Sequence, residues 1–464
     1  MLGCGKGGTI FAVVPVLGTG FTTRWTVSGD ATARTITLPL NNGNGSAFSC
    51  TVNWGDGSAD SMITAYNDAA RIHTYASNGT YNVEIKGTCE GWSFNNAGDK
   101  TKIVAVVDWG TSGVFGGFKY LTGGFYGCSI AALPVTGGIL SAGSSLVDLS
   151  RCFSDCYSIT TLPADLFRFA SACITFGSCF YNGLGLTTLP ADLFRYNTAA
   201  TNWGNTFFGC SGLTTLPAGL FQYNTAAYIF GGTFTNCSGL TAIPTDFFRY
   251  NTAVSTFGYC FFNCQSVASI PTDLFRYNTV ATDFGVCFQQ CYALTSIPTD
   301  LFRYNTLAFN FGSAFAACTS LTVVPADLFR YNTNASDFSY TFYGCTVLAS
   351  VPADLFRYNL GVYSGGIAHG FVGVFQGCTK LQLHASIFFG AGEESTRFLN
   401  ITVSFQDAFN RTSFTGTQGV APDLWACNFG TGTPTKTTCF GGAGNSETSL
   451  SNYASIPIAW GGPA

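Results

Sequence analysis

The residues that could carry acid–base chemistry are few and scattered in this sequence. The chain has three histidines, and they fall in different regions: His73, His369 and His384. The only loose candidates for paired carboxylates, which cleave glycosidic bonds in many enzymes, are Glu393 and Glu394 with Asp407. No G-x-S-x-G, Gly-Lys-Ser/Thr phosphate loop or H-E-x-x-H pattern occurs. The sequence therefore predicts a protein that is not an enzyme and needs no cofactor.

Cysteine is the reactive residue type that recurs, with 19 copies. One set lies seven residues before a proline: Cys156, Cys210, Cys237, Cys264, Cys291, Cys318 and Cys345, with Gly183 as the exception. A second set lies eleven residues before a proline: Cys152, Cys179, Cys260 and Cys287. The resulting C-x₃-C spacing is not the usual zinc spacing. Bridging between like cysteines of stacked coils stays open, but a small buried side chain at a tight corner is the favoured interpretation.

These cysteines belong to a repeat of 27 residues, marked by prolines at 163, 190, 217, 244, 271, 298, 325 and 352. Phe recurs ten residues before each proline, aliphatic residues four and one before it, and Leu-Phe usually three and four after it. A fixed period in this range predicts a solenoid in which each repeat is one stacked coil. We expect the L-x-x-L/I segment to form a short strand and the P-x-D-L-F-R-Y-N segment a short helical turn that begins at proline.

Two further columns are polar. Asn lies seven residues after the proline: Asn197, Asn224, Asn251, Asn278, Asn305, Asn332 and Asn359. We expect a ladder of amides that satisfies backbone groups at a turn. Asp two residues and Arg five residues after the proline face each other on one turn: Asp192 with Arg195, Asp246 with Arg249, Asp273 with Arg276, Asp300 with Arg303, Asp327 with Arg330 and Asp354 with Arg357.

One coil loses both charges together, because Gly219 and Gln222 replace the Asp and the Arg. This joint loss favours a self-neutralising ion-pair ladder over a bare Arg column that binds acidic glycans or phosphates. Positions that vary between coils should lie outside the packed interior, where a solenoid forms recognition surfaces. They give a candidate binding surface, with drift of unconstrained residues as the alternative: Asn202, Tyr228, Ile229, Gln289, Gln290, Phe309, Asn310, Asp337 and Tyr343.

The segment before the repeats has a different pattern. Alternating apolar residues separated by Gly, Asn and Asp turns predict a small antiparallel sandwich over residues 21–107, after a Gly-rich arm at 1–20. The W-G-D-G motif at Trp54, the H-T-Y motif at His73 and the following G-T-Y-x-V motif at Gly79 resemble the PKD family of immunoglobulin-like domains. The resemblance implies a β-sandwich spacer typical of surface proteins. We expect Asp56 to cap its turn, with calcium binding as the weaker alternative, and His73 to make a hydrogen bond at a strand end.

The repeats resemble the BspA-like leucine-rich repeats of bacterial surface proteins through an F-x-x-C-x-x-L-x-x-I/L-P core. This resemblance implies adhesion or host-surface binding. The expected fold is therefore mainly β with short helical turns: the sandwich, a leucine-rich-repeat-like solenoid over residues 108–378, and a degenerate C-terminal cap over 379–464. Imperfect copies of the repeat around Pro422 and Pro457 indicate the cap.

Composition narrows the function further. Only 9% of the residues are charged, with a net charge of −4, which disfavours nucleic-acid binding through counterion release. No apolar run reaches the length of about 20 residues that a membrane span needs. We expect an elongated, non-enzymatic protein of a phage virion surface, such as a fibre, receptor-binding or capsid-decorating adhesin. Its partners would be a host-surface glycan or protein and other virion or surface proteins, with a homo-oligomer as an option. A bacterial cell-surface adhesin and a purely structural cement protein are the alternatives.

Overall fold

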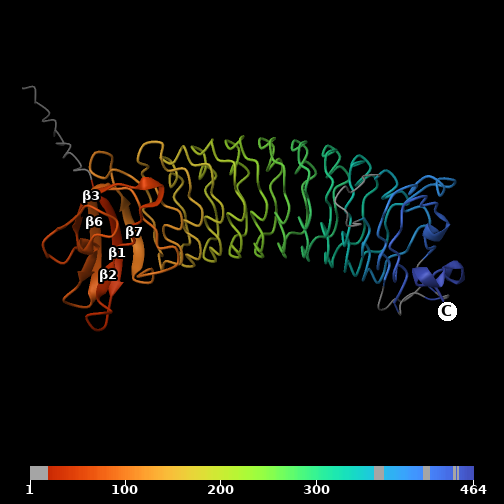
Figure 1. Ribbon diagram of the computed structural model, residues 1–464, viewed down its shortest axis with the longest axis horizontal. Helices are drawn as coiled ribbons and strands as arrows, with labels where there is room; N and C mark the ends of the chain where they lie inside the picture. Colours follow the sequence, from red (N-terminus) through yellow and green to blue (C-terminus); the bar gives the residue numbers. More distant parts are fainter. Residues whose placement is uncertain (1–18, 360–369, 411–418, 443–445, 447–448, 464) are drawn as a thin grey trace, which may run out of the picture.

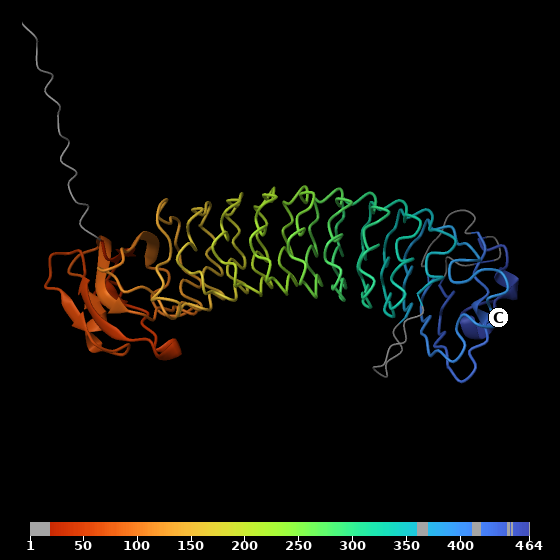
Figure 2. The ribbon, with the colours of Figure 1, turned by 90° about the horizontal axis from the view of Figure 1, so that it is seen from above.

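The computed structural model describes residues 19–359, 370–410, 419–442, 446 and 449–463 of the 464-residue chain. These residues form an elongated rod, with a group of strands at the N-terminal end and a long stack of coils behind it (Figures 1 and 2). The helices among them are five short 3₁₀ turns: η1 (Gly43–Gly45), η2 (Ala69–Arg71), η3 (Leu424–Ala426), η4 (Tyr453–Ser455) and η5 (Ile458–Trp460). The prediction of a β-rich chain with little helix is confirmed. Residues 1–18 of the expected N-terminal arm lie outside the described residues.

The N-terminal strands form two antiparallel sheets around one core. They are β1 (Phe21–Val27), β2 (Thr35–Thr37), β3 (Phe48–Asn53), β4 (Ser61–Ile63), β5 (Ile72–Thr74), β6 (Gly79–Cys89) and β7 (Ile103–Trp109). The larger sheet has the order β4-β3-β6-β1-β7, and β2 pairs with β5. Along β1 every second side chain is buried, which gives the alternation expected of a sheet with one covered face. The expected boundary between residues 107 and 108 falls inside β7.

Each 27-residue repeat, which we call a coil and name by its proline, lies beside the next one. Residues twelve positions after the proline pair with their equivalents 27 residues on as parallel bridges, in an unbroken series from Thr175 to Asp337, and Asp148 pairs with Thr175 in the same way. Nearby N–H groups also bond to the following coil, for example Phe180 N to Thr206 O at 2.8 Å. The stacked coils are visible as the evenly spaced turns in the middle of Figure 1.

The expected position of the short strand is wrong for most coils. The L-x-x-L/I segment forms bridges only from Ser296 through Val323 and Ser350 to Gln382. The inter-coil ladder runs instead through the residues fifteen to eight before each proline, where two residues per coil have positive φ, such as Ser178 and Asn182 at 56°. These positive φ values interrupt a regular strand, because alternate N–H groups then turn back to bond within their own coil.

The expected helical turn after the proline is also absent from the described coils. In the P-x-D-L-F-R-Y-N segment the N–H groups bond three residues back, as from Leu193 to Pro190 O at 3.2 Å and from Asn197 to Phe194 O at 3.1 Å. The chain therefore follows successive tight turns. This path places the Phe side chain four residues after each proline against its equivalents in the neighbouring coils.

The interior contains three columns of aromatic rings. Phe residues ten before each proline stack face to face, for example Phe261 on Phe288 with ring centroids 5.6 Å apart. Parallel columns lie four residues after and fourteen residues before each proline, as in Phe275 on Phe302 and Phe284 on Phe311. Because each coil leaves its apolar edges open, a neighbour is required on both sides.

Other elements cover the two ends of the aromatic columns. Trp109 of β7 contacts Phe125 and Phe153 at centroid distances of 5.9 and 6.4 Å, so the N-terminal sheet covers the first coils. At the other end the stacking continues through Phe409 and Phe440, 5.0 Å apart, into the expected cap. The residues after 378 therefore extend the stack as irregular, longer coils.

The asparagine column lies wholly inside the stack. Asn278 Nδ2 donates to Phe248 O at 3.1 Å and to Asn251 O at 2.8 Å, both in the preceding coil. The same two bonds recur in every coil from Asn197 to Asn359, and all seven side chains are buried. Each amide therefore satisfies two backbone carbonyls that water cannot reach.

A buried arginine ends this ladder. Arg397 Nη2 donates to Phe356 O at 2.8 Å and Asn359 O at 2.9 Å, the pair of carbonyls that a further asparagine would take. Its Nε donates to Phe388 O at 2.9 Å. Burial lowers the pKa of the Arg397 guanidinium to about 10, which leaves it charged at neutral pH. The side chain is 6% exposed, so it closes the ladder without opening the interior to water.

Replacing an interior ladder amide should destabilise the stack. Asn278→Ala leaves two buried carbonyls without donors, and we expect a loss of about 2–4 kcal/mol in the free energy of unfolding. Urea denaturation of both proteins measures this loss. The control is Asn334→Ala, because exposed Asn334 also donates to the preceding coil, at Thr306 O, yet should cost under about 0.5 kcal/mol. Equal losses for the two variants would contradict a buried ladder.

Removing the terminal arginine should loosen one end of the rod. Arg397→Met leaves buried carbonyls unpaired, and we expect local stability after residue 370 to fall by about 3 kcal/mol while the N-terminal sheets keep theirs. Hydrogen exchange measured by mass spectrometry distinguishes the two ends. Arg397→Lys should not restore protection, since a single ammonium group lacks the planar set of donors. Rescue by lysine would show that charge alone is required.

Candidate binding face of the coil stack

The cysteine columns are part of the packed interior. Cys264 Sγ donates to Phe234 O at 3.2 Å, and its equivalents make the same contact with the preceding coil. In the second column Thr206 and Thr233 replace cysteine and also donate to buried carbonyls. Burial raises the pKa of the Cys291 thiol to about 12, so this group stays protonated at neutral pH. Among the described residues no group of three or more His, Cys, Asp or Glu side chains is placed to hold a metal ion.

The Asp and Arg columns form an exposed stripe together with tyrosines. Arg276 Nη1 lies 3.3 Å from Asp273 Oδ1, and the pairs at Asp246, Asp300 and Asp327 measure 3.0–3.3 Å. The pair at Asp192 and the earlier pair at Asp165 are looser, at 4.0 and 3.9 Å. The stripe therefore neutralises most of its own charge.

The guanidinium groups of Arg195, Arg249, Arg276 and Arg303 also lie over tyrosine rings of their own coil and the next. Arg276 is 5.9 Å from the Tyr277 centroid and 5.3 Å from that of Tyr304. The last arginine departs from the expected pairing with Asp354: Arg357 forms its ion pair with Glu393. More residues separate this coil from the next than elsewhere in the repeat, and Glu393 contacts the Arg357 guanidinium. The Glu393 carboxylate therefore has a structural role as the partner of Arg357.

The Asp407 carboxylate has partners different from those of Glu393. It accepts hydrogen bonds from Asn410 Nδ2, at 2.9 Å, and from the Thr438 hydroxyl. The backbone carbonyl of Glu394 accepts from Asn428 N at 3.1 Å.

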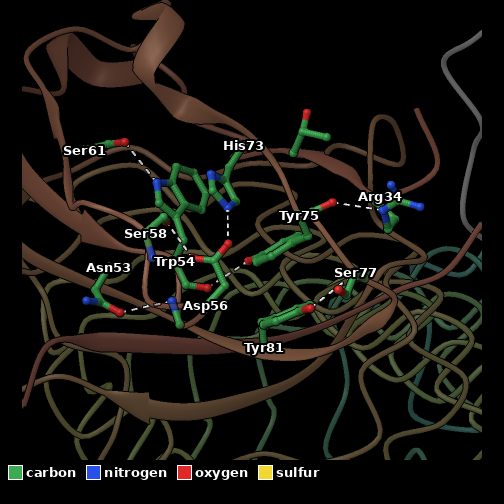
Figure 3. A network of polar contacts seen from close by, with 12 residues as sticks. Arg34, Asn53, Trp54, Asp56, Ser58, Ser61, His73, Tyr75, Ser77 and Tyr81 are labelled. Atoms are coloured by element: carbon green, nitrogen blue, oxygen red, sulfur yellow. Dashed lines mark hydrogen bonds and ion pairs between the residues drawn. The ribbon is translucent and has the colours of Figure 1, made fainter. Parts of the chain in front are cut away.

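In the N-terminal sheets, the W-G-D-G and H-T-Y motifs meet in one polar cluster (Figure 3). His73 Nε2 lies 2.8 Å from Asp56 Oδ2, and Ser58 donates to Asp56 Oδ1 from its N–H at 3.0 Å and its hydroxyl at 2.6 Å. The His73 ring stacks on Trp54 with centroids 4.7 Å apart. Burial raises the pKa of Asp56, but hydrogen bonds from Ser58 and His73 outweigh it and lower that pKa to about 2. The cluster fixes the turn after β3.

The surface that varies between coils contains an open groove of about 340 Å³, which we call the Tyr259–Tyr340 groove. It is lined by Tyr259, Asp283, Gly285, Val286, Asn310, Gly312, Ser313, Asp337, Ser339 and Tyr340. These residues come from four successive coils. The lining contains two rows of side chains. The polar row consists of Asp283, Asn310 and Asp337, twelve positions after their prolines, and the second row begins with Tyr259 and ends with Tyr340.

The polar row of the groove is held by hydrogen bonds between coils. Thr256 Oγ1 donates to Asp283 Oδ2 at 3.0 Å, and Asn310 Nδ2 donates to Asp283 Oδ1 at 2.8 Å. Each side chain also accepts from a backbone N–H two residues on, as from Gly285 to Asp283 Oδ1 at 2.9 Å. The row therefore presents fixed acceptors to solvent.

A second open groove occupies the earlier coils on equivalent positions. Its lining includes Arg151, Ser178, Asn202, Asn205 and Ile229, and no aromatic residue is among its lining residues. The variable surface thus changes along the rod, from a lining with one arginine to one with two aspartates and two tyrosines.

The structure places the nine candidate surface residues in three groups. Asn202 and Ile229 line the earlier groove, and Asn310 and Asp337 line the Tyr259–Tyr340 groove. Tyr228 and Phe309 are exposed just before these positions in their coils. Tyr343 is exposed, and Gln289 and Gln290 are half-buried. Sequence analysis did not identify Asp283, Tyr259 or Tyr340 as surface candidates. The bulky side chains of Tyr259 and Tyr340, twelve positions before Pro271 and Pro352, were the signal that could have identified them.

No protein-family model and no curated protein matches the sequence. Among solved structures, the chain is similar to one in the Toll–Spatzle complex of Drosophila, with a TM-score of 0.27 and 16% sequence identity. The similarity covers 57% of this chain and 38% of that chain. Within the described residues, no helix has the length and apolar character to cross a bilayer.

The Asp56 cluster should stabilise the N-terminal sheets in a pH-dependent way. A carboxyl whose pKa falls from about 3.9 when unfolded to about 2 when folded adds stability that is present above pH ~4 and lost as pH falls toward 2. We expect Asp56→Asn to lower the melting temperature at pH 7 and the difference from wild type to shrink toward pH ~2. Exposed Asp60→Asn is the control. A difference that stays constant with pH would contradict the proposed role of the carboxylate.

Proposed function

We propose that this chain is an elongated, non-enzymatic binding protein whose coils form a leucine-rich-repeat-like solenoid. The observation that carries this proposal is the division of residues within each coil. The repeated Phe, Cys and Asn side chains are buried and bonded to neighbouring coils, and the repeated Asp and Arg are paired with each other. The residues that differ between coils form the open grooves. Such a division leaves recognition to the variable surface.

The chemistry of the grooves supports binding rather than catalysis. The Asp283 carboxylate is fixed by three hydrogen-bond donors, and its lining neighbours are neutral or acidic. A shallow, neutral-to-acidic surface with aromatic side chains is suited to holding an extended partner.

We further propose a phage virion as the setting, with host-surface recognition as the role. Seventeen cysteines of the described residues, all but Cys378, are free and buried. Free thiols in this number are typical of proteins that fold in a reducing cytosol, where virions assemble, rather than of exported proteins. A bacterial cell-surface adhesin and a structural cement protein remain the competing roles.

Binding to cells tests the proposed role. The fluorescently labelled full-length chain should bind intact bacteria or isolated envelopes from at least one member of a panel of species, and mass spectrometry should find the chain in a purified phage particle. Because few charges are available, raising the salt concentration from about 0.05 to 0.5 M should change the affinity less than about threefold. Failure to bind any envelope would leave the cement role and overturn the adhesin role.

A further inference from the structure

Of the two grooves described above on the variable surface, the Tyr259–Tyr340 groove is the one with aromatic residues in its lining. We propose that it binds an uncharged chain of pyranose sugars lying along the rod axis. This inference rests on the proposed binding function and names its ligand class. It is carried by the two tyrosines, the fixed polar row between them and the charge of the lining residues.

The two tyrosines provide flat apolar faces at the two ends of the groove. Tyr259 is 55% and Tyr340 39% exposed. Each is supported by an edge-to-face neighbour, Phe262 at 6.1 Å and Tyr343 at 5.9 Å between ring centroids. A supported tyrosine has few rotamers to lose on binding, so it offers contact area at low entropic cost. The C–H faces of pyranose rings pack on such surfaces.

The row between the tyrosines matches sugar hydroxyl groups. Asp283 accepts three hydrogen bonds, and because a carboxylate has about four lone-pair sites, about one remains for a sugar hydroxyl. Ser339 Oγ lines the same groove and finds no hydrogen-bond partner in the described part of the chain. The side chains of this row are held in place before any ligand arrives, which limits the entropic cost of binding.

Glycine keeps the floor of the groove open. A Cβ atom on Gly285 would lie 2.6 Å from Asn310 Nδ2, and one on Gly258 would lie 2.8 Å from Asp283 Oδ2. Any larger residue would therefore displace the polar row that the ligand is expected to contact. The glycine positions and the polar row thus form one arrangement over several coils.

Charge and length select the ligand class. The lining contains two aspartates and no Lys or Arg, which disfavours phosphorylated, sulfated or uronic-acid chains. The tyrosines are three coils apart, or about 15 Å at a strand spacing near 4.8 Å. A pyranose unit in an extended chain advances by a length similar to one coil. The groove therefore fits a short run of consecutive sugar units, with a terminal ring at each tyrosine.

The test uses the full-length chain with uncharged tri- to hexasaccharides of glucose and of N-acetylglucosamine, first on an array and then by calorimetry. We expect binding to at least one oligosaccharide series and little binding to sulfated chains. The double variant Tyr259→Ala/Tyr340→Ala should weaken binding at least about tenfold, or 1.4 kcal/mol. The matched control is Tyr157→Ala/Tyr292→Ala, since both tyrosines are exposed but lie outside the lining of this groove and outside the candidate surface. Melting temperatures establish that all variants are folded.

The outcomes separate this inference from the proposed function. If the chain binds envelopes but no oligosaccharide, or if the control variant weakens binding as much as the groove variant, the sugar site is overturned and the binding role stands. If the chain binds sulfated chains more tightly than uncharged ones, the ligand class is wrong. If it binds neither envelopes nor sugars, both the site and the proposed function fail.

Discussion

The 27-residue register between neighbouring coils is the constraint on which the whole rod depends. The interior side chains cannot be satisfied within one coil: the Phe rings need a ring on each side, and the Asn278 amide needs carbonyls of the coil before it. A repeat of different length would place unlike side chains against each other in every column at once. Stability therefore comes from nearest-neighbour interfaces, as is general for repeat proteins.

This dependence explains why the two ends differ from the middle. At the N-terminal end, the sheet containing Trp109 replaces a preceding coil and covers the first rings of the stack. At the C-terminal end, Arg397 takes over the two carbonyls that an asparagine would occupy. Its longer side chain and several donors allow the chain to leave the 27-residue period there while the buried backbone remains satisfied. Irregular coils can then follow without a further ladder.

Sequence alone identified the features that repeat, because identical side chains in identical positions must share one environment. The buried role of the Asn column follows from the properties of an amide in an apolar coil, and the Asp–Arg pairs follow from their three-residue spacing. The backbone path did not follow in this way. Positive φ at Val286 and Tyr259 has no signal in residue type, since glycine and asparagine occupy only some of these positions. A turn of that kind is imposed by stacking, which pattern analysis along one chain does not detect.

The groove was beyond sequence analysis for a related reason. Asp283, Asn310 and Asp337 lie 27 residues apart, so their contact depends on the register, and their distance from Tyr259 and Tyr340 depends on the positive-φ turn between them. The Arg357 pair with Glu393 likewise arises where the period changes. The same register that fixes the interior thus determines which variable residues meet outside. Under the proposed binding role, substitutions in the variable columns would alter recognition at little cost to folding, since the interior columns carry the stacking energy. Recognition would then rest on shape, aromatic contact and hydrogen bonding along several coils, because most charged side chains of the coils are already paired with each other.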